Sequence, residues 1–214
     1  MPDIKAPWPK GEHRELSPEQ RQSILVETRA SRPDGALWVF AFGSLMWNPC
    51  FDYDEWDVAV LSGWERKFHI WTTVARGTPE RPGLGLCLEK GEGSCKGIVY
   101  RLRPENEDGD WIALWYREMN SGVYRTLWTD VETENSSRVK ALTFVADLDH
   151  QQYAGPLPVD VMADIMAGAR GRYGRCRDYL AGTVAEMAKL GVHDPHMSKL
   201  LELVDSREAV PATS

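Results

Sequence analysis

The sequence predicts an α+β fold in which most of the strands precede a helical C-terminal third. Residues 37–102 are rich in β-branched and aromatic residues and are punctuated by Gly and Pro, a pattern typical of strands joined by turns. From residue 159 onward, three helices are predicted. With 214 residues and 43% hydrophobic content, the chain is long enough to bury the core of one domain and short for two.

The charge and the cysteines exclude several classes of function. The formal net charge is −7 and no segment is strongly basic, which argues against a nucleic-acid partner or an anionic membrane surface. No apolar run approaches the roughly 18 residues of a membrane span, and the first residues lack a signal pattern. The four cysteines form no C-x-x-C pair, so reduced, partly buried thiols and a cytoplasmic location are expected.

Residues 1–34 are predicted to be an N-terminal extension with one helix. The proline-rich lead-in, residues 1–16, shows little periodicity. Ser17-Pro-Glu-Gln20 then combines an N-cap serine, a proline at the first helical position and a glutamine at the third, which is a capping box. The helix is expected to run to about Arg29.

The main domain is predicted to span residues 35–205 and to begin with strands. An apolar strand at residues 37–42 is followed by two strands joined by a turn at Gly63. A Gly/Pro-dense loop precedes a hairpin whose turn lies at residues 89–94. The expected strands are residues 57–62, 66–74, 84–88, 96–102, 123–128 and 138–146.

The helices of this domain are predicted from periodicity and caps. In residues 105–119, Trp111, Leu114 and Trp115 have the spacing of one helical face. A turn-rich link at residues 153–158 leads to helices at residues 159–169, 176–190 and 195–204, the last capped by Asp194. Residues 206–214 are expected to form a flexible tail.

The first candidate site is the point where the apolar strand stops, at Gly43-Ser44. A glycine with positive φ and a small neighbour would leave backbone N–H groups uncovered, and such a loop can hold a carboxylate or a phosphate. The alternative is a plain strand exit with a turn glycine.

The second candidate is Glu118, which continues the apolar face of its predicted helix. Burial and the negative end of the helix dipole would both disfavour the ionised carboxylate. A carboxyl group with a raised pKa can accept and return a proton near neutral pH. The alternatives are that Glu118 turns into solvent or pairs structurally with Arg117 or Arg125. The acidic residues before it are expected to form the first helical turn; they are Glu105, Glu107, Asp108 and Asp110.

The remaining candidates are weaker. His193 and His196 lie three residues apart without a third ligand, which disfavours a metal site. Ser44 lacks the G-x-S-x-G context of a hydrolase nucleophile. Arg76 could clamp a ligand carboxylate, or it could be a solvated loop residue, as could Arg81. Tyr179 could direct its hydroxyl into a site or simply pack its helix.

Five motifs in one order carry a resemblance to a known family. They are Phe42-Gly-Ser-Leu-Met-Trp47, Arg76-Gly-Thr-Pro-x-x-Pro-Gly83, Trp115-Tyr-Arg-Glu-Met119 followed by Gly122-Val-Tyr-Arg125, Tyr153-x-Gly-Pro156, and Gly174-Arg-x-x-x-Tyr179. Over residues 37–204 the chain resembles the ChaC-like family of glutathione-specific γ-glutamylcyclotransferases.

The resemblance implies a γ-glutamylcyclotransferase-like fold, which is a closed, barrel-like, mainly antiparallel sheet with flanking helices. It also implies conversion of glutathione to 5-oxoproline and cysteinylglycine without a metal or a cofactor. Glu118 would be the acid/base. The substrate-binding residues would be Phe42, Gly43, Ser44, Leu45, Arg76 and Tyr179. Phe42 stands where many relatives have tyrosine, so any hydroxyl contact from that position would be absent.

Two other functions stay open at this point. The chain could act on other γ-glutamyl amino acids or amines, or it could be a glutathione-binding module that has lost catalysis. An intact Glu118 weighs against the second.

Overall fold

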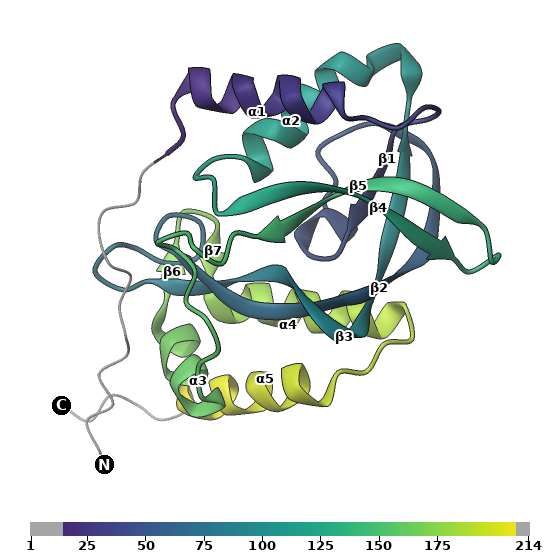
Figure 1. Ribbon diagram of the computed structural model, residues 1–214. Coiled ribbons are helices and arrows are strands. Elements are labelled where there is room, and N and C mark those ends of the chain that lie inside the picture. Colours follow the sequence, from purple (N-terminus) through teal and green to yellow (C-terminus); the bar gives the residue numbers. More distant parts are fainter. Residues whose placement is uncertain (1–14, 209–214) are drawn as a thin grey trace. The chain divides into compact units, whose positions relative to one another are not determined.

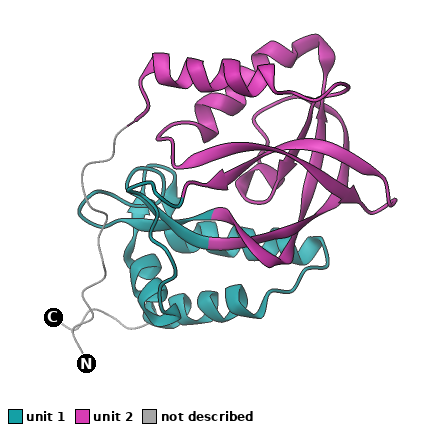
Figure 2. Cartoon of the chain, in the orientation of Figure 1, with its two compact units in different colours: residues 1–13, 68–86, 148–214 teal, residues 14–67, 87–147 magenta. Residues whose placement is uncertain are grey.

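A computed structural model describes residues 15–208 of the chain. These residues form two compact units (Figure 2). The barrel unit contains the described residues up to Lys67 together with Cys87–Asp147. The helical unit contains Phe68–Leu86 and the described residues from Leu148 onward.

The sheet is a closed five-stranded barrel with the strand order β1-β3-β2-β4-β5 (Figure 1). Its strands are β1 (Trp38–Ala41), β2 (Tyr53–Thr72), β3 (Gly83–Leu102), β4 (Tyr124–Thr133) and β5 (Arg138–Ala146). β1 runs antiparallel to β3 and parallel to β5, and β4 runs antiparallel to β2 and β5. The prediction of a closed, mainly antiparallel sheet is confirmed.

The barrel core lies in the barrel unit and is built from alternate residues of these strands. Phe40 of β1, Leu61 of β2, Leu88 and Val99 of β3, and Val131 of β4 are buried together in one apolar cluster. Because strand side chains alternate between two faces, this inward set follows from the period-2 pattern of the sequence.

Two predicted turns are wrong, because β2 and β3 each continue through the glycines that suggested them. Gly63 has a φ of +78° within β2. Gly91 and Gly93 lie in the middle of β3, where a β-carbon would come within 2.8 Å of the Glu65 side chain. The backbone N–H of Gly93 instead donates to Glu65 Oε1 at 3.1 Å. Gly91 and Gly93 therefore make room for a side chain of the neighbouring strand, and Gly63 adopts a positive φ that favours glycine. None of the three reverses the chain.

Gly97 of β3 also permits a close approach. A β-carbon there would lie 2.9 Å from Cζ of Phe40 and would also collide with the backbone oxygen of Ala41. We expect Gly97→Ala to lower the free energy of unfolding by about 1–3 kcal/mol, the usual cost of overpacking a core. Gly85→Ala in the same strand is the matched control, because its nearest neighbours are 3.8 Å away. Urea denaturation measures both, and equal stability of the two variants would contradict the prediction.

Helix α1 (Pro18–Ala30) has the predicted capping box, with Ser17 Oγ accepting from the backbone N–H of Gln20. It packs beside α2 (Glu107–Glu118) in the barrel unit (Figure 1). The indole Nε1 of Trp115 donates to the carbonyl of Arg21 at 2.9 Å. Helix α1 thus supports α2, a role that the sequence did not indicate.

A 3-10 turn, η2 (Pro104–Asn106), precedes α2, so Glu105 lies just before the helix. The other three acidic residues lie in the first turn of α2, as predicted, and each has a structural contact. Glu107 pairs with Arg32, and Asp108 pairs with Arg29 at 2.9 Å. Asp110 accepts a hydrogen bond from the backbone N–H of Asp52 at 3.2 Å, which ties α2 to the chain entering β2.

The helical unit contains α3 (Val159–Gly168), α4 (Cys176–Lys189) and α5 (Pro195–Glu208). A small hairpin of β6 (Arg170–Gly171) and β7 (Gly174–Arg175), which the sequence analysis did not predict, lies between α3 and α4. Asp194 caps α5 as predicted, since its Oδ1 accepts from the N–H groups of His196 and Met197.

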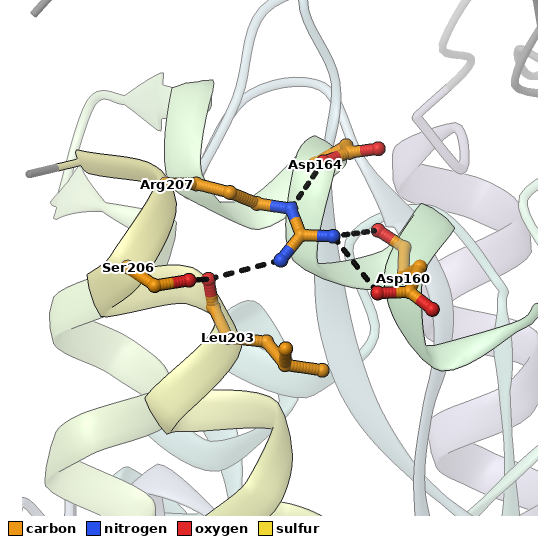
Figure 3. Close-up of polar contacts among 5 residues, drawn as sticks. All are labelled: Asp160, Asp164, Leu203, Ser206 and Arg207. Carbon is orange, nitrogen blue, oxygen red and sulfur yellow. Dashed lines mark hydrogen bonds and ion pairs between the residues drawn. The ribbon is translucent and has the colours of Figure 1, made fainter. Parts of the chain in front are cut away.

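The predicted tail begins too early, because α5 continues to Glu208. Arg207 of α5 reaches α3, where it pairs with Asp164 and, at 3.0 Å, with Asp160 (Figure 3). Its Nη1 also donates to the Leu203 carbonyl at 3.1 Å. These contacts stabilise the last helical turn. Residues 209–214 of the predicted tail, and residues 1–14 of the predicted lead-in, lie outside the described residues.

Between residues 15 and 208, the chain has no helix that is both long and apolar enough to cross a membrane.

Candidate functional site

Glu118 is the last residue of α2, and its side chain is 18% exposed. The helix places it one turn beyond the buried Leu114 and Trp115, as the spacing predicted. Burial raises the pKa of the Glu118 carboxyl, and the positive charge of Arg117 opposes part of that rise. The predicted direction of the pKa shift is confirmed, and the alternative in which Glu118 turns into solvent is wrong.

The structure also decides between the two arginines considered as partners of Glu118. Arg125 pairs with Asp147 at 2.7 Å. Arg117 is the partner, with 3.4 Å between its Nε and Oε1 of Glu118. This distance is long for a charge-assisted hydrogen bond. Arg117 and Glu118 therefore attract each other electrostatically but do not form a tight bidentate ion pair.

The apolar strand ends at Ala41, and the β1–β2 loop (residues 42–52) follows it. Within this loop Ser44–Met46 form one turn of 3-10 helix, η1, with Gly43 at its N-cap. The φ of Gly43 is −131°, so the prediction of a positive φ is wrong. The tight turn is instead formed by the 3-10 hydrogen bond from the N–H of Met46 to the carbonyl of Gly43, at 2.9 Å.

Side chains from three other elements hold the β1–β2 loop. Arg66 of β2 donates from Nε to the carbonyl of Phe42 at 2.5 Å. The hydroxyl of Tyr100 in β3 donates to the carbonyl of Met46 at 2.9 Å. Arg117 of α2 donates from Nη1 to the carbonyl of Asn48 at 2.5 Å and from Nη2 to Ser44 Oγ at 2.9 Å.

Sequence reasoning missed Arg66 and Tyr100 and treated Arg117 only as a possible pair for Glu118. All three donate to this loop, and each of them donates to at least one of its backbone carbonyls. A backbone acceptor leaves no residue type to recognise in the sequence. The hydrophobic periodicity of β2 and α2 was the only sequence signal for these residues. It predicts which side chains are buried, but not which groups they bond to.

The barrel unit thus brings together the two strongest candidates, because Arg117 contacts both Ser44 and Glu118. Cys50 of the same loop lies close enough for the charges of Arg117 and Glu118 to act on its thiol. Burial is the largest influence and raises the pKa of Cys50. The thiol is therefore protonated at neutral pH and is a poor nucleophile.

The two residues on either side of Gly43-Ser44, Phe42 and Leu45, have apolar surroundings. Phe42 is partly buried and packs against the barrel core cluster, and Leu45 is buried. A phenyl ring suits this environment, since a hydroxyl group buried without a partner would be costly.

The helical unit brings together the other two candidates. The guanidinium carbon of Arg76 lies 5.1 Å from the centroid of the Tyr179 ring, a cation–π distance. Nη1 of Arg76 also donates to the carbonyl of Tyr173. The β6–β7 hairpin packs closely against the chain at residues 74–76. A β-carbon at Gly171 would lie 2.5 Å from the Val74 carbonyl oxygen. Arg76 is therefore partly exposed, but its guanidinium has two defined partners in this unit.

Among residues 15–208, no group of three or more His, Cys, Asp or Glu side chains is arranged to hold a metal ion. His193 and His196 belong to no such group.

Comparison with known proteins assigns the chain to a family. A family model described as "ChaC-like protein" matches residues 37–207. The chain belongs to the ChaC-like family. This ChaC-like chain is 38% identical over 186 residues to the glutathione-specific γ-glutamylcyclotransferase of Escherichia coli, covering 86% of this chain and 80% of that protein. It is 30% identical over 196 residues to human glutathione-specific γ-glutamylcyclotransferase 1, covering 88% of each.

Solved structures bear out the fold of the ChaC-like chain. A crystal structure of a glutathione-specific γ-glutamylcyclotransferase from yeast aligns with a TM-score of 0.73, covering 81% of this chain and 97% of that one. The sequence identity is 21%, so this likeness concerns the fold alone. The family motifs named above all lie inside the matched residues.

Proposed function

We propose that this ChaC-like protein is a glutathione-specific γ-glutamylcyclotransferase that converts glutathione to 5-oxoproline and cysteinylglycine, with Glu118 as the general acid/base. The observation that carries the proposal is a buried carboxyl group of raised pKa joined through Arg117 to the β1–β2 loop. The names of the bacterial and human relatives support the substrate and the reaction.

The reaction needs a group that carries protons, but it needs no enzyme nucleophile, because the substrate supplies its own. The α-nitrogen of the γ-glutamyl group attacks its own γ-carbonyl carbon, so the bond of the five-membered lactam forms and the bond to the cysteinyl nitrogen breaks. An ammonium group cannot attack, and the departing nitrogen must be protonated. Two protons therefore move from the α-nitrogen to the cysteinyl nitrogen. Ionised Glu118 accepts each proton, and the resulting carboxylic acid returns it.

The β1–β2 loop would bind the γ-glutamyl group. The first residues of a short helical turn have N–H groups without intrahelical acceptors, and those of Ser44 and Leu45 would hold the α-carboxylate and the carbonyl region. Gly43 and Phe42 would complete the wall of this subsite. Holding the substrate bent toward ring closure lowers the entropic part of the barrier. By family analogy, Arg76 and Tyr179 would contact substrate as well.

The cytoplasm is the expected location. Cys87, Cys95 and Cys176 are buried and none of the three is in a disulfide, as expected for a compartment that keeps thiols reduced.

A product assay tests the proposal. Purified protein incubated with glutathione should release 5-oxoproline and cysteinylglycine in equal amounts, as measured by chromatography. The same assay with γ-glutamyl-alanine identifies a broader cyclotransferase if it is turned over at a similar rate. Glutathione binding in a calorimeter without product would overturn the proposed activity and favour a binding module.

A further inference from the structure

Arg117 connects the two parts of the candidate site. Each of its three guanidinium nitrogens has a different partner. Nη1 donates to the Asn48 carbonyl at 2.5 Å, Nη2 donates to Ser44 Oγ at 2.9 Å, and Nε lies 3.4 Å from Glu118 Oε1. The first two partners lie at either end of the loop segment that contains η1, and the third is the proposed acid/base.

Arg117 and Glu118 are both partly buried, which strengthens their electrostatic interaction relative to that of a surface pair. The Arg117 side chain is 24% exposed and that of Glu118 is 18% exposed, so solvent screens them less than it screens a surface pair. The planar guanidinium also has its donors in a fixed fork, so its three contacts are geometrically coupled. A movement of the loop away from α2 would therefore break the contacts to Ser44 and Asn48.

We propose that Arg117 is a positioning residue that sets the β1–β2 loop and the Glu118 carboxylate at the separation needed for ring closure. The proposal rests on the proposed function, because that function supplies the substrate that must span the two parts. The loop holds one end of the γ-glutamyl group, and Glu118 must reach the α-nitrogen a few bonds away. A misplacement of about 1 Å in such a geometry costs on the order of 10²-fold in rate.

Arg117 has a second effect, on the protonation of Glu118. The charged or titratable groups that act here are Arg117 and the Cys50 thiol, and the loop also contributes the neutral hydroxyl of Ser44 and the carbonyl of Asn48. Burial raises the pKa of Glu118, and Arg117 lowers it. Loss of Arg117 therefore raises that pKa further. Because Glu118 must be ionised to act as a base, the acidic limb of the kcat/KM profile would then move to higher pH.

The test compares Arg117→Gln with Arg117→Lys. Arg117→Gln removes the charge and the fork, so we expect kcat to fall by about 10²-fold and the acidic limb to move to higher pH. Arg117→Lys keeps a charge beside Glu118 but has only one nitrogen. We expect it to retain the wild-type acidic limb and still lose kcat.

The matched control is Arg125→Gln. Arg125 pairs with Asp147 and is 63% exposed, so its loss should leave kcat and the pH profile unchanged. Thermal unfolding of each variant shows whether it is folded. A carbon-13 NMR titration of the Glu118 carboxyl in wild type and Arg117→Gln reads the pKa without relying on turnover.

The outcomes are distinguishable. If wild-type protein releases no 5-oxoproline, the proposed function fails. If wild type is active while Arg117→Gln keeps its kcat and pH profile, only the positioning role fails. If Arg117→Gln does not fold, Arg117→Lys decides, because wild-type kcat in that variant would overturn the proposal.

Discussion

We expect the Glu118→Gln variant to release 5-oxoproline about 10²–10⁴-fold more slowly than wild type, the usual contribution of a general acid/base. The amide is nearly the same size as the carboxyl group and would retain the packing at the end of α2, but it cannot accept and return a proton. The rate of product release at saturating glutathione measures the effect. Glutathione binding should be retained, because the proposed subsite for the γ-glutamyl group lies in the β1–β2 loop.

The same variant should be as stable as wild type at neutral pH, or more stable. The pKa of Glu118 in the folded protein is raised above its ordinary value of 4.5, chiefly by burial. The stability linked to this group is therefore fully present below the unfolded pKa and is lost as the pH rises through the folded pKa. At pH 7 the ionised carboxylate of Glu118 lowers the free energy of unfolding, and a glutamine at this position removes that penalty. Thermal unfolding at pH 7 and pH 5 measures it, and the advantage of the variant should shrink at the lower pH.

Glu202→Gln, which changes an exposed carboxylate on α5, is the matched control and should match wild type in rate. Wild-type turnover in Glu118→Gln would show that another group carries the proton. A large loss of stability in Glu118→Gln would instead show that the ionised side chain is mainly structural.

The second large effect is expected from Trp111→Ala in α2. Trp111 is 1% exposed, its ring lies 6.0 Å from that of Trp115 and 6.2 Å from that of Trp128, and the guanidinium of Arg29 lies over it. Truncation would leave a cavity between α1, α2 and β4. We expect the free energy of unfolding to fall by about 3–5 kcal/mol, as measured by urea denaturation.

This loss should also reduce turnover, because α2 carries Arg117 and Glu118 at its end. Trp56→Ala is the matched control. Trp56 is 56% exposed on β2, so its removal should change stability by no more than about 0.5 kcal/mol. If the two variants unfolded at the same urea concentration, the packing of α2 against α1 would not be a main source of stability.

Helices were the best predicted part of the fold. The capping box at Ser17, the N-cap at Asp194 and the apolar spacing of Trp111 and Trp115 are local signals, and each corresponds to an observed helix. Strand β5 was predicted with its observed bounds. Such features depend on residues within a few positions of each other, so neighbouring letters are enough to read them.

The long strands were not predictable in this way. Gly63, Gly91 and Gly93 carry the local signal of a turn, yet all three lie inside strands. The role of Gly91 and Gly93 depends on Glu65, which fills the space that side chains at these two positions would need. The end of α5 is similar, because Arg207 is held by Asp160 and Asp164 of another helix.

The sequence by itself therefore placed Glu118 in line with the apolar face of its helix and predicted the direction of its pKa, while leaving open whether its side chain turns into solvent. The structure decided that point, because the side chain is 18% exposed. The sequence also identified the family, through five motifs in order. Only the tertiary structure showed that the β1–β2 loop and Glu118 share one arginine, since Ser44 and Arg117 are 73 residues apart. A hydrogen bond across that separation depends on how β1 and α2 pack in the barrel unit, and no local pattern encodes it.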